Sequence, residues 1–466
     1  MFSGGHGDGG EKAYFQVMND TDLTHVHAIR RALAYLHAPA FKIALDPDRP
    51  QCHFLPPARW MNDPNGTLFY KGWYHLFYQL NPFGDTWGFM HWGHARSRDL
   101  IHWEHLPIAL APDVEQGEEH CYSGCIALNR DGQPRLLYTS VGFVDTRPFM
   151  QCMAITSDPD LQTWQRTLTP AISGELVALA EDARDPFVFS FKGRTFVILG
   201  ERQRVPLFEA VGGDLSHLVE RAPLFVVDPL LIQFCECPNF LKVGDDRWLL
   251  LLSPYRAVEW YLGTFDGERF IIERQGRLDE RDAFYATNTL TDDRGCTVVV
   301  GWIRGFPSGR GWNGCLSLPR VIELDARAGI RQRPHPCTIL LRQGEAKKWC
   351  GTVSGSHVLA DGIAPAAEVI VTVVGSLGLR ICGINVGWDG SHLTVGDAAI
   401  ELSVTTLELH LFVDRTVIEV FADGGRTVIT CVITAPARDE LVVVSSIHAV
   451  VDATVYRLAL SDDPTK

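Results

Sequence analysis

A polar turn beside an aromatic residue recurs at nearly regular intervals through the first half of the chain. Ser97–Trp103 is echoed by Ser157–Trp164 and, more weakly, by Gly213–Leu218 and Phe265–Phe270. Intervals of 61, 54 and 52 residues separate the aspartates of these segments: Asp99, Asp160, Asp214 and Asp266. Each interval holds about four short apolar segments bounded by turn residues, which is typical of the blades of a β-propeller.

The repeat predicts an all-β fold, a five-bladed β-propeller over residues 50–325, although coincidence among common turn residues is an alternative. Past residue 350 the pattern changes, and alternating apolar residues at 407–413 with a hairpin over 417–429 predict a β-sandwich. A chain of 466 residues exceeds what one core usually holds, so two domains are expected. The predicted parts are an N-terminal tail and helix (1–48), the propeller (49–330), a linker (331–349) and the sandwich (350–466).

One segment near the N-terminus has helical periodicity instead. Apolar residues recur at helical spacing between Asp20 and Leu36, with Arg30 and Arg31 on the other face, so a short helix is expected. Residues 1–12 are expected to form a disordered tail. They lack the basic and apolar regions of a secretory signal, so a cytoplasmic location is expected unless a leader was removed.

Charge and composition exclude several classes of function. The formal net charge of −14 argues against non-specific binding of nucleic acid. No apolar run reaches the ~18 residues of a membrane span. The 12 cysteines include no CxxC pair and lie mostly in apolar surroundings, which favours buried free thiols over disulfides or structural zinc. The 17 histidines show no convincing ligand spacing, so neither a metal nor an organic cofactor is expected.

Three short segments place a carboxylate where a predicted strand meets proline or glycine. They are Trp60–Gly66 with Asp63, Ala183–Pro186 with Asp185, and Phe234–Pro238 with Glu236. The acids are 122 and 51 residues apart. Inner strands of different blades meet at the central funnel of a propeller, so the three acids are predicted to converge on one small ligand.

Cleavage of a glycosidic bond gives such a set a chemical reason. The reaction uses one ionised and one protonated carboxyl group, and further negative charge stabilises its oxocarbenium-like transition state. Crowded acids also separate each other's pKa values. Taken singly, Asp63 could belong to a hairpin turn and Asp185 to a surface ion pair with Arg184, whereas Glu236 in an apolar run is costly without a purpose.

In combination the segments resemble glycoside hydrolase family 32, the invertases, inulinases and levanases. Trp60–Gly66 is similar to the signature that carries the family's nucleophile, Arg184–Pro186 to its transition-state stabiliser motif, and Glu236–Cys237 to its acid/base motif. The resemblance covers about residues 50–460 and includes these further segments: Phe77–Pro82, Trp92–Ala95, Tyr122–Gly124, Asp282–Ala286, Gly301–Trp302, Leu318–Arg320, Phe412–Arg415 and Glu419–Phe421.

The resemblance implies a retaining β-fructofuranosidase that releases fructose from sucrose, a fructan or a fructo-oligosaccharide. Asp63 is the implied nucleophile and Glu236 the acid/base, with carboxyl groups roughly 5–5.5 Å apart, and Asp185 binds sugar hydroxyls. Asn62, Gln79 and Ser123 are expected to hydrogen-bond the fructose, and Arg184 to keep nearby acids charged. Trp87 and Trp302 are expected to form apolar walls, unless their indoles belong to the propeller core.

Three alternatives use the same sequence features. A fructosyltransferase would pass the fructosyl group to a sugar through the same residues. An inverting pentosidase and an inactive carbohydrate-binding protein are the others. Substrate preference, including phosphorylated sucrose, and oligomeric state are left open. The acidic stretch Val114–Cys121 is expected at the pocket rim, while Asp414 and Glu419 are expected to be structural.

Overall fold

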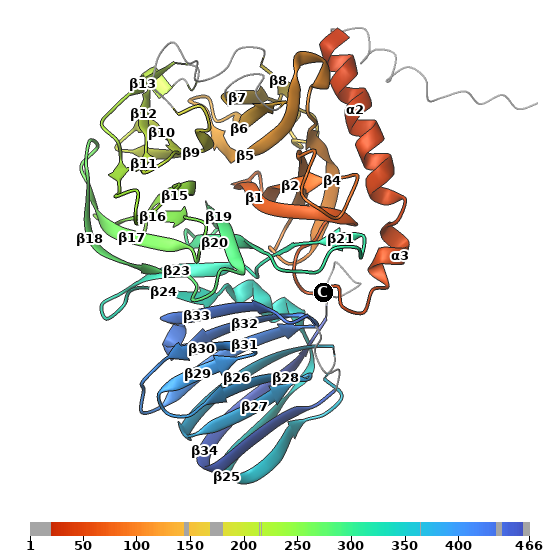
Figure 1. Ribbon diagram of the computed structural model, residues 1–466, viewed down its shortest axis with the longest axis vertical. Helices are drawn as coiled ribbons and strands as arrows, with labels where there is room; N and C mark the ends of the chain where they lie inside the picture. Colours follow the sequence, from red (N-terminus) through yellow and green to blue (C-terminus); the bar gives the residue numbers. More distant parts are fainter. Residues whose placement is uncertain are drawn as a thin grey trace, which may run out of the picture.

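Five antiparallel sheets surround a central axis, and a separate ten-stranded sheet follows them in the chain (Figure 1). The computed structural model describes residues 20–143, 149–167, 180–213, 215, 217–363, 365–434 and 440–459. The predicted tail over residues 1–12 and Asp214 of the repeat lie outside this set. The predicted fold class, a five-bladed propeller followed by a β-sandwich, is confirmed.

Each blade is a meander whose first strand lies nearest the axis. Blade 1 contains β1 (Arg59–Tyr70), β2 (Trp73–Asn81), β3 (His91–Ser97) and β4 (Trp103–Leu110). Blade 2 contains β5 (Glu118–Leu128), β6 (Pro134–Gly142), β7 (Met150–Ile155) and β8 (Gln165–Arg166). Blade 3 contains β9 (Arg184–Phe191), β10 (Arg194–Gly200), β12 (Leu207–Ala210) and β13 (Leu218–Glu220), beside the pair β11 (Arg204–Val205) and β14 (Phe225–Val226).

The last two blades follow the same plan. Blade 4 contains β15 (Glu236–Lys242), β16 (Trp248–Ser253), β17 (Glu259–Phe265) and β18 (Phe270–Arg277). Blade 5 contains β19 (Phe284–Thr291), β20 (Thr297–Ile303), β22 (Cys315–Leu316), β23 (Arg320–Asp325) and β24 (Gly329–Pro334). Every residue of β16 is buried, because a strand inside a blade is covered by a neighbouring blade on each face.

Two of the recurring aspartates, Asp99 and Asp266, occupy the turn between the last two strands of their blades. Asp99 Oδ1 accepts hydrogen bonds from the backbone N–H groups of Ile101 and His102, and Asp266 Oδ1 accepts two in the same way. In blade 2 the carboxylate that closes the turn is Asp158, two residues before the Asp160 of the sequence pattern. Asp325 closes the corresponding turn of blade 5, so the repeat is an Asx-turn that fixes the outer hairpin.

The ring is closed by a strand from blade 5 and by the N-terminal helices. β21 (Trp312–Asn313) pairs in parallel with the start of β1. Helix α2 (Asp20–His37), at the predicted position, and a short α3 (Ala40–Ala44) pack Ala32, Leu36 and Ile43 into the core shared by blades 5 and 1. α3 was not predicted from the sequence, since five residues carry little helical periodicity.

The second sheet surrounds one apolar core. Its strands are β25 (Arg342–Ala360), β26 (Ala366–Gly375), β27 (Leu377–Ile381), β28 (Ile384–Trp388), β29 (His392–Val395), β30 (Ala398–Glu401), β31 (Leu407–Asp414), β32 (Val417–Ala422), β33 (Thr427–Val432) and β34 (Val442–Leu458). Four 3₁₀ turns complete the described elements: η1 (Val114–Gln116), η2 (Val211–Gly213), η3 (Pro336–Leu341) and η4 (Asp423–Gly425). The predicted hairpin over 417–429 is β32–β33.

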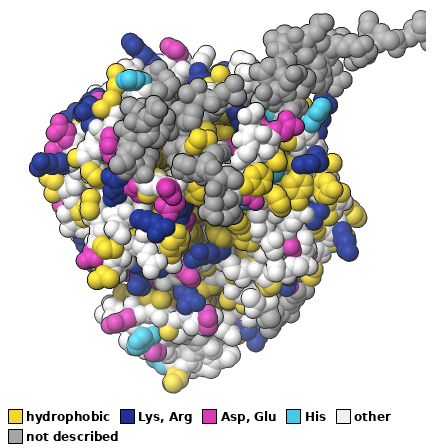
Figure 2. All heavy atoms as spheres, turned by 45° about the horizontal axis from the view of Figure 1, so that its top comes forward, with side chains coloured by type: hydrophobic (Ala, Val, Ile, Leu, Met, Phe, Trp, Pro, Cys, Tyr) yellow, Lys and Arg dark blue, Asp and Glu magenta, His cyan; other side chains and the backbone are white. Residues whose placement is uncertain are grey.

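The distribution of surface charge and the state of the cysteines agree with the expectations from composition. On the face seen in Figure 2, basic and acidic side chains are interspersed, without a broad basic area. All 12 cysteines are free thiols, nine of them buried, as predicted. Within the described ranges, no helix is long and apolar enough to cross a membrane, and no three His, Cys, Asp or Glu side chains are grouped to hold a metal ion.

Candidate active site

The five innermost strands each change register near their first residues, at one end of the propeller. In β1, β5, β9, β15 and β19 the pairing with the next strand slips within a few residues of the start. Asp185, Cys237 and Ala286 lie within the slip in blades 3, 4 and 5, with positive φ angles of 61°, 48° and 47°. Such bulges re-aim neighbouring side chains, and strained backbone of this kind concentrates at functional sites.

Asp63 lies in the bulge of β1, where both of its carboxylate oxygens accept hydrogen bonds. Ser123 Oγ donates to Oδ2 at 2.6 Å, and Asn62 Nδ2 donates to Oδ1 at 3.0 Å. Trp60 Nε1 in turn donates to Asn62 Oδ1 at 2.8 Å. Asn62 and Ser123, predicted as sugar ligands, therefore also fix the orientation of this carboxylate.

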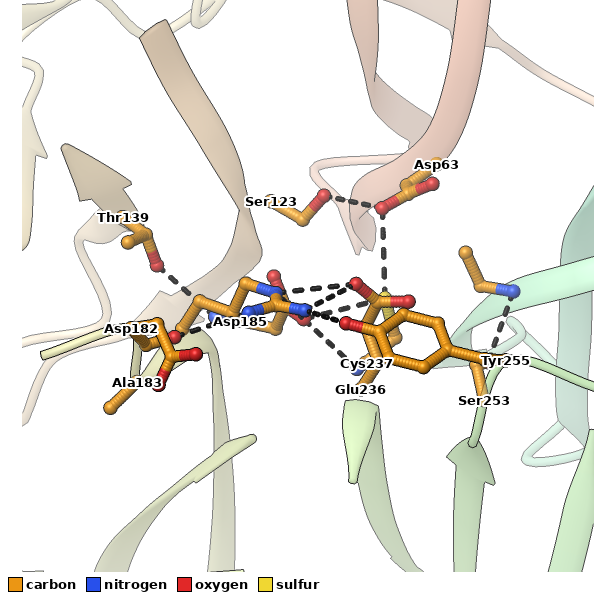
Figure 3. Close-up of polar contacts among 12 residues, drawn as sticks. Asp63, Ser123, Thr139, Asp182, Ala183, Asp185, Glu236, Cys237, Ser253 and Tyr255 are labelled. Atoms are coloured by element: carbon orange, nitrogen blue, oxygen red, sulfur yellow. Dashed lines mark hydrogen bonds and ion pairs between the residues drawn. The ribbon is translucent and has the colours of Figure 1, made fainter. Parts of the chain in front are cut away.

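Asp185 lies opposite Asp63, and Cys237 occupies the space between them (Figure 3). The Cys237 thiol is 3.6 Å from Asp63 Oδ2 and 3.6 Å from Asp185 Oδ2, and the Cys237 backbone N–H donates to the same Asp185 oxygen at 3.0 Å. Thr139 Oγ1 accepts a hydrogen bond from the Asp185 backbone N–H at 3.1 Å. Residues of blades 1, 3 and 4 thus meet at one point.

Glu236, the first residue of β15, is held by Arg184 from the neighbouring blade. Arg184 Nη2 donates to Glu236 Oε1 at 2.8 Å and Nε donates to it at 3.2 Å, while Nε lies 3.8 Å from Asp185 Oδ2. Gly200 permits this close approach of blades 3 and 4, because a Cβ there would lie 2.5 Å from the carbonyl oxygen of Cys235. All three predicted acids and Arg184 therefore belong to one cluster.

Tyr285 supplies the other contact of Glu236. Its hydroxyl lies 2.7 Å from Glu236 Oε2 and 2.6 Å from the carbonyl oxygen of Ser253, and it accepts from the Tyr255 N–H at 3.0 Å. Burial, together with the charge of Glu236, raises the pKa of Tyr285, so the residue stays a phenol. One phenolic proton cannot serve two acceptors. Tyr285 can therefore donate either to Glu236 Oε2 or to the carbonyl oxygen of Ser253.

Burial and mutual repulsion set the charges of the acids. Burial raises the pKa of Asp63, with the charge of Glu236 adding to it and the hydrogen bond from Ser123 opposing it. Burial raises the pKa of Asp185 to about 7, against the lowering effect of Arg184. The charges of Glu236 and Asp63 add to the effect of burial and also raise the pKa of Asp185.

Asp185→Asn is therefore expected to stabilise the fold at alkaline pH. The folded-state pKa of Asp185 lies above its unfolded value, so its contribution is fully present below about pH 4 and is lost as pH rises through 7. At pH 8 the variant should be more stable by on the order of 2–4 kcal/mol, and near pH 4 the two proteins should match. Denaturant unfolding at both pH values measures this, with exposed Asp131→Asn as the control. Equal stability of Asp185→Asn and wild type at pH 8 would contradict the assignment.

The remaining predicted residues differ in exposure and in surroundings. Gln79 is 1 % exposed, and its Nε2 donates to the carbonyl oxygen of Cys121 at 2.9 Å. Trp87 is 52 % exposed, with its ring 5.0 Å from that of His120. Trp302 packs edge-to-face on Trp60 at 5.6 Å, and both indoles line a cleft of about 450 Å³ beside the sandwich. Gln79 is therefore buried, Trp87 is exposed, and Trp302 lines a cleft that contains none of the three acids.

Within the acidic stretch Val114–Cys121, which was expected at the pocket rim, one carboxylate is buried. Glu118, part of the acidic stretch expected there, is 3 % exposed and pairs with Arg166 inside blade 2. Asp113, just before the stretch, pairs with the same guanidinium at 2.9 Å. The charge of Glu118 is neutralised within the blade because burying an unpaired carboxylate is costly.

Several supporting residues were not identified as such from the sequence. Thr139 Oγ1 donates to Gln151 Oε1 at 2.8 Å, and Gln151 Nε2 donates to the carbonyl oxygen of Ala183 at 2.8 Å, which ties blade 2 to the start of β9. With its amide turned to satisfy its neighbours, Asn65 donates to Ser123 Oγ at 3.2 Å. Asn65 was visible in the signature segment, whereas Thr139 and Gln151 stand in ordinary strand sequence without any local signal.

Comparison with known proteins agrees with this arrangement. The model of the glycosyl hydrolases family 32 N-terminal domain matches residues 53–334, and that of the family's C-terminal domain matches residues 386–457. A sucrose-6-phosphate hydrolase of Klebsiella pneumoniae is 32 % identical over 83 % of this chain and 88 % of its own. One from Zymomonas mobilis is 33 % identical over 81 % of this chain and 84 % of its own.

A solved structure extends the likeness to three dimensions. The GH32 β-fructofuranosidase BmSUC1 of Bombyx mori superposes with a TM-score of 0.79 at 28 % identity, covering 93 % of this chain and 98 % of its own. The first family model spans more than half of the chain, and its span contains all three acids. The chain therefore belongs to glycoside hydrolase family 32.

Proposed function

We propose that this glycoside hydrolase is a retaining β-fructofuranosidase that hydrolyses sucrose, with Asp63 as nucleophile, Glu236 as acid/base and Asp185 as a ligand of the fructose hydroxyls. The observation that carries the proposal is the cluster of three carboxyl groups, one from each of three blades, around the Cys237 thiol and the Arg184 guanidinium. Relatives named as sucrose-6-phosphate hydrolases and β-fructofuranosidases support the substrate class, as does the structure of a BmSUC1 mutant in complex with sucrose.

In the first step Asp63 attacks the anomeric carbon of fructose. The bond to the glucosyl oxygen breaks, and Glu236 transfers its proton to that oxygen, so glucose leaves neutral. The hydrogen bonds from Ser123 and Asn62 hold Asp63 in one orientation for this attack. The product is an ester between Asp63 and the fructosyl group.

In the second step Glu236, now ionised, takes a proton from water. The resulting hydroxide attacks the anomeric carbon, the ester bond breaks, and β-fructofuranose leaves with its configuration retained. Arg184 donates two hydrogen bonds to Glu236 Oε1, while Tyr285 can accept from the protonated form of Glu236 or donate to the ionised one. The pair therefore accommodates both charge states that the cycle needs.

The substrate and the acceptor are tested together by product analysis. Sucrose should yield equal amounts of glucose and fructose at low and at high sucrose concentration, since water is the proposed acceptor. Sucrose 6-phosphate, inulin and levan assayed in parallel would define the range of leaving groups. An excess of glucose over fructose with accumulating fructosylated sugars would identify a transferase instead, and no fructose from any of the four would overturn the proposal.

A further inference from the structure

Tyr255 is the most exposed side chain in direct contact with the residues that hold Glu236. It lies in the loop between β16 and β17 of blade 4 and is 53 % exposed, whereas Tyr285 is 4 % exposed. Its φ angle is 61°, a conformation that bulky side chains rarely adopt. Backbone strain at an exposed aromatic residue is expected where the side chain is held in place for ligand binding and not for packing of the core.

Hydrogen bonds fix the Tyr255 ring at both ends. Its hydroxyl accepts from Arg184 Nη2 at 2.7 Å, and its backbone N–H donates to the Tyr285 hydroxyl. Arg184 and Tyr285 are also the two side chains that contact the Glu236 carboxyl group, so the four residues form a closed ring of hydrogen bonds. Tyr255 forms the solvent side of this ring.

The mechanism places the leaving group on this side. The fructosyl unit must reach Asp63 and Asp185, which lie deep in the pocket, and the leaving oxygen must lie within hydrogen-bond reach of Glu236. The remainder of the leaving group then extends towards solvent past Glu236. A tyrosine ring offers an apolar face of low conformational entropy there, suited to the apolar face of a pyranose.

We propose that Tyr255 determines specificity for the leaving group by providing the face against which the leaving hexose packs. This inference rests on the proposed function and names a residue of its leaving-group subsite. Loss of the ring should weaken transition-state binding of substrates whose leaving group is a sugar. It should affect much less a substrate whose leaving group is too small to reach the ring.

The test compares sucrose with methyl β-D-fructofuranoside, which has the same fructosyl unit and a methanol leaving group. In Tyr255→Ala and Tyr255→Leu, kcat/KM for sucrose relative to that for the methyl fructoside should fall roughly fivefold to tenfold. The fall should come mainly from KM for sucrose. Tyr255→Phe keeps the ring, so its ratio should stay within about twofold of wild type.

A matched control is Tyr35→Ala, because Tyr35 on α2 is 52 % exposed and lies outside the pocket. Its ratio should equal that of wild type, and thermal unfolding should show that every variant is folded. If Tyr255→Ala and Tyr255→Leu lose both substrates equally, or neither, the ring only supports Glu236 and the inference is wrong. If wild type hydrolyses neither substrate, the proposed function itself fails, which is a separate result.

Discussion

Asp63→Ala is expected to lower kcat for sucrose by at least about 10⁴-fold. The variant lacks the atom that bonds to the anomeric carbon, and the rest of the site cannot replace it. Ser123 and Asn62 lose a hydrogen-bond acceptor but remain next to the solvent-accessible pocket, where water can take its place. The fold and the affinity for substrate should therefore be preserved. Initial-rate kinetics with sucrose measures the loss of kcat, and thermal unfolding shows whether the fold is preserved.

Asp131→Ala is the matched control for this variant. Asp131 lies in the exposed turn between β5 and β6, outside the pocket, so its removal should leave kcat within about twofold of wild type. An Asp63→Ala protein that is folded and retains more than a small percentage of wild-type kcat would remove Asp63 from the mechanism.

Glu419→Gln is expected to destabilise the protein by about 3–5 kcal/mol without changing the pocket. Glu419 is fully buried where the propeller meets the sandwich, and it accepts from Arg320 Nη2 at 2.6 Å and from the Leu318 backbone N–H at 2.8 Å. His53 joins it to Asp414, with ring nitrogens 3.0 Å and 2.8 Å from the two carboxylates. Loss of one charge leaves the buried charges of Arg320 and His53 incompletely compensated.

The pH dependence of this loss follows from the same contacts. Burial lowers the pKa of His53, but its bonds to Asp414 and Glu419 outweigh burial and raise it to about 9, so this contribution is lost as pH rises from 6.5 through 9. Burial raises the pKa of Glu419, but Arg320 and His53 outweigh it and lower the value to about 2, so that contribution is lost as pH falls from 4.5 through 2. The difference between wild type and variant should be largest between pH 4.5 and 6.5.

Denaturant unfolding across this pH range measures the effect. Glu273→Gln is the control, because Glu273 pairs with Arg247 on the surface with both side chains about 40 % exposed, and such pairs contribute about 0–1 kcal/mol. A Glu419→Gln loss no greater than that of the control would show that the network does not hold the two parts of the chain together.

The propeller could be predicted because its repeat is encoded locally. An Asx-turn needs an aspartate at a fixed place in each blade, and a strand needs a short apolar run. Both can therefore be recognised in the sequence. The predicted position of the aspartate was wrong by two residues in blade 2, where Asp158 closes the turn and Asp160 does not. Asp325 was missed, because no recognised aromatic partner follows it at the expected place.

The acids could be predicted for a similar reason, since each stands in a short segment with its own backbone irregularity. Three of their partners could not. Thr139 and Tyr285 reach the cluster from strands β6 and β19, and Tyr255 reaches it from the loop after β16. Only the packing of one blade against the next brings these residues together. The exposure of single residues could not be predicted either. Glu118 and Glu119 are adjacent glutamates in the sequence, yet Glu118 is buried against Arg166. Contacts between blades therefore require coordinates.

Trapping the covalent intermediate would test nucleophilic attack by Asp63 most directly. In Glu236→Gln the first step can proceed with 4-nitrophenyl β-D-fructofuranoside, whose leaving group needs no proton, while the second step lacks its base. Rapid acid quenching and peptide mass spectrometry should then find one fructosyl group on the peptide that contains Asp63. An adduct on another residue, or none together with α-fructofuranose as the first product of the wild-type enzyme, would contradict nucleophilic attack by Asp63.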